Sequence, residues 1–150
     1  MSVSRRIVLV VTLLGTAVAC QAQWVAVARA VSGRIQRMEQ QNANGSGGYD
    51  VATVVIQAQA QKVYQTAVQR LQAHTDQVKV LNQDAKKRTV AFTNGTLTAS
   101  LQANPLGDNL TQLVVASTLA PAQNNATSLV VKSIQSVCTE LKVVCVLEDQ

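Results

Sequence analysis

The sequence has few of the residues on which catalysis and metal binding usually depend. It holds one histidine, His74, and the acids that could orient it fall in predicted turns: Asp76, Asp84 and Asp108. A general base needs a nucleophile and an orienting acid beside it. One histidine with a C-x6-C pair gives neither the number nor the spacing of zinc ligands. The sequence therefore predicts no catalytic residue, no metal and no cofactor, and we interpret the chain as a protein that is not an enzyme.

Aromatic side chains are almost as scarce, with one Trp, one Phe and two Tyr. The core must therefore be built mainly from Val, Leu, Ile and Ala. The basic run Lys86-Lys87-Arg88 lacks the aromatic neighbours on which single-stranded nucleic acid stacks, and it falls in a predicted turn. We interpret it as a solvated turn and expect no nucleic-acid partner. Contact with phosphates or lipid headgroups is the alternative.

Apolar runs long enough to cross a bilayer are also missing. Residues 7–19 carry no charge, but Gln21 and Gln23 interrupt the run before apolar residues resume at Trp24. A membrane-spanning helix needs about 20 consecutive apolar residues. A cleaved signal over residues 1–19 is therefore the prediction, and a membrane span is the alternative.

The end of this run has the layout of a secretory signal peptide. Arg5 and Arg6 precede the run, and two alanines stand just before Cys20. The pattern resembles the signal of bacterial lipoproteins, in which this cysteine is acylated and becomes the new N-terminus. The resemblance implies a palmitate-type membrane anchor at Cys20. Because Gln21 rather than Asp follows the cysteine, it also implies an outer-membrane location facing the periplasm.

Residues 20–48 are predicted to connect the anchor to the folded domain. Apolar residues recur at helical spacing from Trp24 to Met38, which predicts an amphipathic helix over residues 21–41. Its candidates for contact with the membrane surface are Trp24, Arg29, Arg34 and Arg37. A helix or loose spacer packed on its own domain is the alternative. Residues 40–48 are polar and glycine-rich, which predicts a flexible tether.

Residues 49–150 are predicted to form one α+β domain. Alternating apolar residues predict a strand over residues 52–59, and helical stripes predict helices over 60–74 and 126–141, the second with Asn125 as N-cap. Further strands are predicted at residues 77–81, 89–93, 96–103 and 110–118, with the hairpin sequence Asn94-Gly95 between two of them and a loop over 104–109. The order β-α-β-β-β-β-α predicts an antiparallel sheet of about five strands with two helices packed on one face.

This order of elements has a family resemblance. Together with Lys62-Val63-Tyr64 at the start of the first helix, and Val78-Lys79-Val80-Leu81 followed by Asp84, it resembles a family of small bacterial envelope lipoproteins of unknown function. More distantly, the layout is similar to the helix-grip domains of the lipoprotein of the outer-membrane barrel-assembly machinery. The resemblance covers about residues 49–141. It implies an envelope location and a non-enzymatic fold, and it carries no catalytic residue.

Cys138 and Cys145 remain as a pair if Cys20 carries lipid. Seven residues of continuous helix rise about 10 Å, whereas the Cα atoms of bridged cysteines lie within about 7 Å. A disulfide therefore needs the helix to end between them. The β-branched residues after position 142 favour extended chain, which predicts a helix end near Leu141 or Lys142 and a disulfide clamp. Two reduced cysteines on a longer helix are the alternative.

Together these features predict a lipid-anchored protein of the bacterial cell envelope that binds or scaffolds another envelope protein. Its predicted working surface is the sheet face without helices, which should display Thr53, Val55 and Gln57. The alternative is a carrier that holds a small apolar ligand or lipid between the sheet and the C-terminal helix. Four Asn-x-Ser/Thr patterns leave a glycosylated eukaryotic protein as a further alternative.

Overall fold

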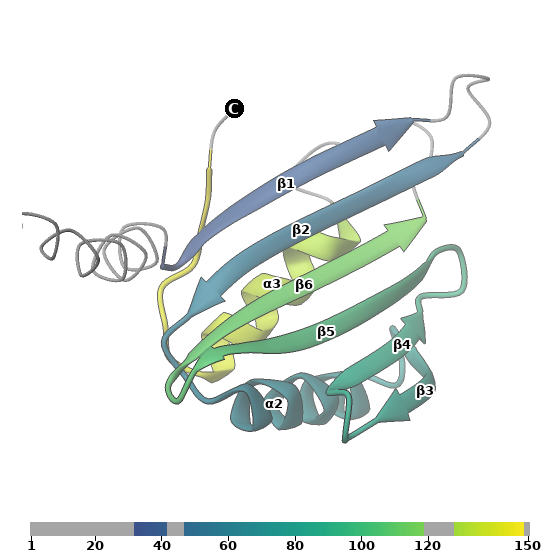
Figure 1. Cartoon of the computed structure of the whole chain (residues 1–150). Coiled ribbons are helices and arrows are strands. Elements are labelled where there is room, and N and C mark those ends of the chain that lie inside the picture. Colours follow the sequence, from purple (N-terminus) through teal and green to yellow (C-terminus); the bar gives the residue numbers. More distant parts are fainter. Residues whose placement is uncertain (1–31, 42–46, 119–127, 149–150) are drawn as a thin grey trace, which may run out of the picture. The chain divides into compact units, whose positions relative to one another are not determined.

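The computed structural model describes residues 32–41, 47–118 and 128–148. Two long neighbouring strands, β2 (Gly48–Ile56) and β6 (Leu110–Thr118), lie in the middle of the sheet (Figure 1). Side chains in both strands alternate between buried and half-buried, because successive residues of a strand point to opposite faces. The buried set is apolar at the centre of each strand. One face of the sheet therefore carries the core.

Within the described residues, seven strands form one sheet in the order β3-β4-β5-β6-β2-β1-β7. The strands not yet named are β1 (Arg34–Gln41), β3 (Lys79–Asp84), β4 (Thr89–Thr93), β5 (Thr98–Gly107) and β7 (Val146–Leu147). Neighbours pair antiparallel except β1 and β7, which run parallel. The predicted α+β class with two helices is confirmed, whereas the predicted count of about five strands missed β1 and β7.

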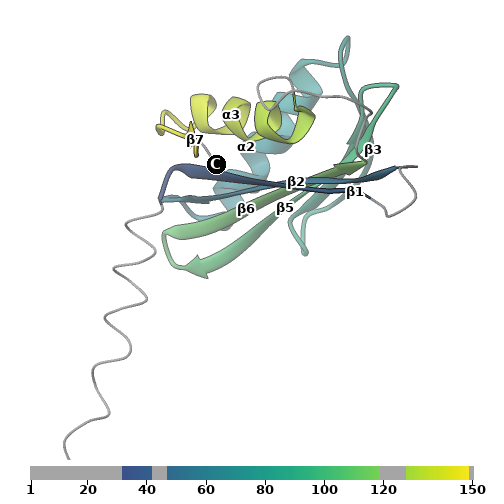
Figure 2. The same ribbon diagram turned by 90° about the horizontal axis from the view of Figure 1, so that it is seen from above.

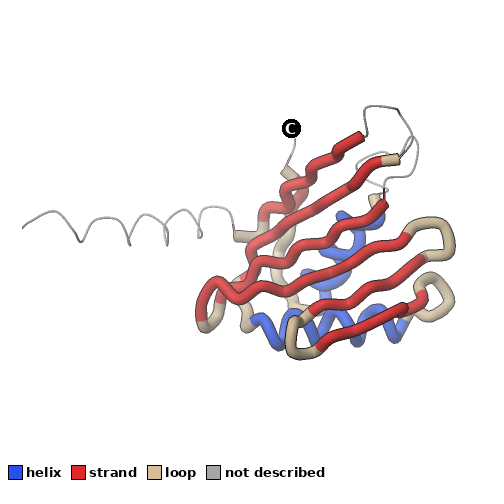
Figure 3. The backbone as a smooth tube through the Cα atoms, turned by 45° about the vertical axis from the view of Figure 1, so that its right-hand side comes forward, coloured by secondary structure: helices blue, strands red, loops and turns tan. Residues whose placement is uncertain are grey.

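Two helices, α2 (Ala60–Ala73) and α3 (Leu129–Glu140), cover one face of the sheet (Figures 2 and 3). The chain's single phenylalanine, Phe92, is fully buried in the core between them and the strands. The other large side chains at its centre are aliphatic, among them Ile56, Leu113 and Ile134. This agrees with the core of Val, Leu, Ile and Ala that the composition predicts. The opposite face of the sheet carries no helix in the described part of the chain.

The second half of the predicted amphipathic helix is a strand instead. Residues Arg34–Gln41 form β1, which pairs with β2 from Gln36 to Gln41. Ile35 is fully buried, while Met38 is 70% exposed, so these two residues do not share the apolar helical stripe that the sequence indicated. The backbone pairing with β2 outweighs the local spacing. Residues 21–31 of the predicted helix, and 42–46 of the predicted tether, lie outside the described residues.

Several predicted boundaries shift by a few residues. The predicted loop over 104–109 is mostly strand, because β5 continues through Pro105 to Gly107 with a register shift there. Strand β3 begins and ends later than predicted, and Asp84 closes its turn by accepting hydrogen bonds from the backbone N–H groups of Lys86 and Lys87. Helix α3 starts at Leu129 with Ser128 as its N-cap, which corrects the prediction of Asn125. Asn125 itself lies outside the described residues.

The C-terminal chain folds back after α3. The helix ends at Glu140, close to the predicted end, and Lys142 has a φ of 56° that reverses the chain direction. Cys138 and Cys145 are joined by a disulfide with their Cα atoms 6.1 Å apart. The reversed segment then places β7 beside β1, where the backbone N–H of Val146 donates to the carbonyl of Gly33 at 2.8 Å. Among the described residues, neither α2 nor α3 is long and apolar enough to span a bilayer.

Candidate functional site

A pocket of about 170 Å³ lies between α2, α3 and the sheet. The fully buried side chains of Phe92 on β4 and Leu101 on β5 line it from the sheet. Ala67 and Leu71 line it from α2, and Leu129, Val137 and Val78 complete its apolar surface. Each of these residues also packs in the hydrophobic core or against it. The pocket is therefore continuous with the core.

Small side chains keep this space open. Ala67 on α2 and Ser133 and Ser136 on α3 all line the pocket. The hydroxyl of Ser133 donates to the carbonyl of Leu129 at 2.8 Å, so its hydrogen bond is made within α3 itself. Larger apolar residues at these positions would fill the gap between the two helices, as they do elsewhere in close-packed interiors.

Basic side chains surround the pocket. Arg70 lies on α2, His74 is the residue that directly follows α2, and Lys132 comes from α3. Among the described residues, no acidic side chain lines the pocket. Arg70 links the two helices, because its Nε donates to Ser136 Oγ at 3.1 Å and its Nη1 to Glu140 Oε2 at 3.5 Å. The pocket thus combines an apolar interior with positive charge around it.

This arrangement is suited to binding. In the described part of the chain, neither Ser133 nor Ser136 is hydrogen-bonded to His74, and Ser136 instead accepts from Arg70. A serine nucleophile needs a base within hydrogen-bond reach. Nor does any group of three or more His, Cys, Asp or Glu that could hold a metal ion occur within residues 32–41, 47–118 and 128–148.

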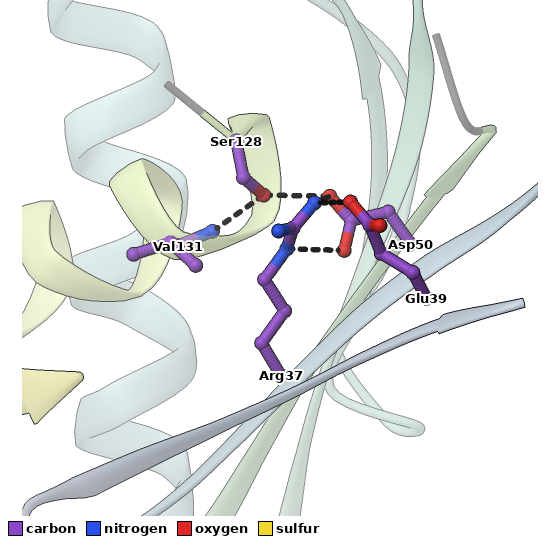
Figure 4. A network of polar contacts seen from close by, with 5 residues as sticks. All are labelled: Arg37, Glu39, Asp50, Ser128 and Val131. Carbon is purple, nitrogen blue, oxygen red and sulfur yellow. Dashed lines mark hydrogen bonds and ion pairs between the residues drawn. The ribbon is translucent and has the colours of Figure 1, made fainter. Parts of the chain in front are cut away.

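A second polar cluster is buried between β1, β2 and the start of α3 (Figure 4). Arg37 on β1 donates from Nε to Asp50 Oδ1 at 2.8 Å and from Nη2 to Oδ2 at 3.1 Å. Arg37 also donates to the carboxylate of Glu39. Ser128 Oγ donates to Asp50 Oδ2 at 2.6 Å and accepts from the backbone N–H of Val131. The cluster therefore fixes the N-terminus of α3 to the β1–β2 hairpin.

The charge of Arg37 is retained in this buried place. Burial by itself lowers the pKa of Arg37, but the hydrogen bond and charge of Asp50, together with those of Glu39, outweigh burial and raise it above its ordinary value. Arg37 and Asp50 are 6% and 1% exposed, and Ser128 is fully buried. Because these three residues are buried and Asp50 links the other two by hydrogen bonds, we assign the cluster a structural role.

The predicted site residues have different outcomes. Cys20, Trp24 and Arg29 lie outside the described residues. Arg34 is exposed and forms an ion pair with Glu148 at 3.4 Å. Arg37 was predicted to face lipid headgroups, and this prediction is wrong because β-strand alternation turns its side chain into the core, where Asp50 neutralises it.

Sequence reasoning missed most of the pocket. Arg70 and Lys132 have no local pattern that points to a pocket, and His74 was considered as a catalytic residue. The backbone N–H of His74 donates to the carbonyl of Leu71 at the end of α2. The available signal was the pair of small residues Ser133 and Ser136, three apart beside the apolar stripe of α3. Small residues on a core-facing helix edge indicate space that a facing helix can leave open.

Comparison with known proteins shows no matching family model and no match among curated proteins. Solved structures with a similar arrangement include a conserved protein of unknown function from Enterococcus faecalis, with 13% identity, a TM-score of 0.47, and coverage of 71% of this chain and 75% of that one. Another is the Zhui aromatase/cyclase from Streptomyces sp. R1128, with 14% identity, a TM-score of 0.36, and coverage of 72% and 85%.

A third similar structure is the di-domain aromatase/cyclase StfQ of the steffimycin biosynthetic pathway, with 11% identity and a TM-score of 0.43. The match covers 59% of this chain and 42% of that one. These findings correct the resemblance drawn from the sequence. The three structures are a protein of unknown function and two aromatase/cyclases, and no family model matches, so the short motifs were too weak to identify a lipoprotein family.

Proposed function

We propose that this protein binds a small, largely apolar molecule in the pocket between α2, α3 and the sheet. The observation that carries the proposal is the open volume of about 170 Å³ against the buried side chains of Phe92 and Leu101. Close-packed interiors have few voids larger than a water molecule. An apolar cavity of about 150 Å³ binds benzene, so this pocket suits a molecule the size of a single ring.

The volume limits the class of ligand. Pockets for drug-sized ligands span roughly 300–1,000 Å³, and a pocket of about 170 Å³ lies below that range. A diacyl lipid is far too large to be enclosed here. This argues against the lipid carrier considered from the sequence and supports a carrier or sensor of a smaller solute. Ligand binding in this pocket needs no catalytic group, and we propose that the protein binds its ligand without catalysing a reaction.

Replacing Ser133 by phenylalanine tests the pocket. The larger side chain should occupy the space between the helices, so Ser133→Phe should weaken binding of benzyl alcohol at least about tenfold. Ligand-observed NMR titration of the full chain measures this change. Gln135→Phe is the matched control, because Gln135 is an exposed residue of the same helix and does not line the pocket.

Two results would contradict the pocket proposal. One is wild-type protein that shows no saturable binding of any single-ring probe. The other is a folded Ser133→Phe variant, with a cooperative thermal transition, that binds as tightly as the wild type and the Gln135→Phe control.

We also propose that Cys20 anchors the protein to a bacterial membrane, with the domain in the periplasm. Support comes from the sequence around Cys20 and from the disulfide between Cys138 and Cys145, since disulfides persist in oxidising compartments. Placement in the outer membrane rests on Gln21 after the cysteine. A domain held in the periplasm would meet small solutes that cross the outer membrane.

Binding of another envelope protein on the sheet face without helices is a second candidate function. The middle strands present no charged residue on that face; its residues include Thr53 and Val55 of β2 and Val114 of β6. An uncharged sheet face is suited to protein contact. A partner complex that is lost in Val114→Lys and retained in Ser133→Phe would favour this function over ligand binding.

A further inference from the structure

We propose that the ligand of this pocket is a monoanion, a single apolar ring or short apolar chain that carries one carboxylate or similar group. This inference rests on the proposed function, because it concerns the same pocket. The volume fixes the size of the ligand, and the charged side chains around the pocket fix its polarity.

The charges around the pocket have one sign. Arg70 and Lys132 are two cations on different helices that line the same space, and His74 is the third basic side chain. Glu140, which pairs with Arg70, is 52% exposed at its side chain and does not line the pocket. An anionic group at the pocket mouth would meet donors from both helices, while an added cation would be repelled by Lys132.

The two cations differ in what they already contact. Arg70 is 34% exposed and uses Nε on Ser136 and Nη1 on Glu140. Its guanidinium has five N–H donors in a planar fork that matches carboxylate geometry, so donors remain for a ligand. Lys132 makes no side-chain hydrogen bond or ion pair with the described residues. Its ammonium is therefore available to a ligand without the loss of an existing bond.

The apolar interior specifies the other end of the ligand. The half-buried side chains of Leu71, Val78 and Leu129 offer apolar surface to a ligand. An inorganic anion would leave this surface unfilled, and a neutral hydrocarbon would leave the cations unpaired. A molecule with one apolar end and one anionic end satisfies both parts of the pocket, as aromatic and short-chain carboxylates do.

Matched ligands test the inference. Benzoate and benzyl alcohol share a ring of the same size and differ in charge, so each can be titrated into the full chain by ligand-observed NMR. Benzoate should bind about tenfold or more tightly than benzyl alcohol. Raising the salt concentration should weaken the binding of benzoate and leave the binding of benzyl alcohol unchanged, because added ions screen the charges at the pocket mouth.

Charge-removing variants assign the preference to these residues. Lys132→Gln and Arg70→Gln should each reduce the ratio of benzoate affinity to benzyl alcohol affinity several-fold, with both affinities measured in the same variant. Lys62→Gln is the matched control, since Lys62 is an exposed residue of α2 that does not line the pocket. Lys132→Gln is the cleaner variant because it breaks no bond within the described residues.

The outcomes separate this inference from the proposed function. Equal affinity for benzoate and benzyl alcohol would overturn the proposal of a monoanionic ligand and leave the pocket as a site for neutral apolar molecules. A benzoate preference that survives both Lys132→Gln and Arg70→Gln would also overturn it. Absence of binding by both probes would overturn the proposed function itself, and the inference with it.

Discussion

Asp50 is the residue on which the buried polar cluster depends. It accepts two hydrogen bonds from Arg37 and one from Ser128, and only 1% of its surface is exposed to solvent. A buried ion pair adds little net stability, because removing both charges from water costs about as much as their attraction returns. Removal of one partner is different, since it leaves the other charge buried and uncompensated.

Asp50→Asn should therefore lower the free energy of unfolding by about 3 kcal/mol. The amide keeps the shape of the carboxylate but carries no charge, so the buried Arg37 loses its attraction to Asp50. Chemical denaturation measures the loss. Glu39→Gln is the control, because Glu39 is 37% exposed and its ion pair should contribute less than about 1 kcal/mol. Equal effects of the two variants would contradict this account of Asp50.

At the scale of elements, the disulfide holds the last strand in place. The bridge joins the C-terminal part of α3 to the residue before β7, and β7 contributes only Val146 and Leu147 to the sheet. A two-residue strand has too few backbone hydrogen bonds to hold itself in position. The covalent ring between Cys138 and Cys145 shortens the free chain that must be ordered.

The double variant Cys138→Ala, Cys145→Ala should lose about 2.5 kcal/mol of stability on the loop-entropy model, because the ring is short. Thermal or urea unfolding under oxidising conditions measures this difference. The reduced wild type should unfold like the double variant. Non-reducing peptide mapping of protein from the periplasm should recover both cysteines in one cross-linked peptide, and recovery of two free thiols would contradict the clamp.

The strength of a local pattern decided which elements could be predicted. Strand β2 and the core of α2 follow from alternation and helical stripes that tertiary packing reinforces. Strand β1 could not be predicted, because its residues include Gln36, Arg37 and Glu39, which give no alternation of hydrophobicity. The sequence alone predicts that Arg37 lies on the surface. Only the fold brings Asp50, 13 positions away, beside it.

The pocket could be predicted least well. Arg70 and Lys132 come from different helices, and neither has a local pattern that distinguishes it from a solvent-facing charge. Their shared position depends on how α2 and α3 pack on the sheet, which is a property of the whole fold. The sequence suggested a cavity beside the C-terminal helix, but its size and its charged lining required the structure.

For the whole molecule, the lipid anchor at Cys20 remains a prediction. If this cysteine is acylated, the mature protein should partition into detergent and incorporate radioactive palmitate. Cys20→Ala should abolish both properties, because the variant lacks the thiol that is modified. Release of unlabelled wild-type protein as a soluble species would contradict the anchor.

The parallel pairing of β1 and β7 brings both ends of the described domain to one edge of the sheet. Strand β4, which contributes Phe92 to the pocket, lies four strands from β1, a separation of about 19 Å at the usual spacing between strands. The strand at which the described domain begins is therefore separated from the strand of Phe92 by three others. A restraint applied at that edge would act on strands that do not line the pocket.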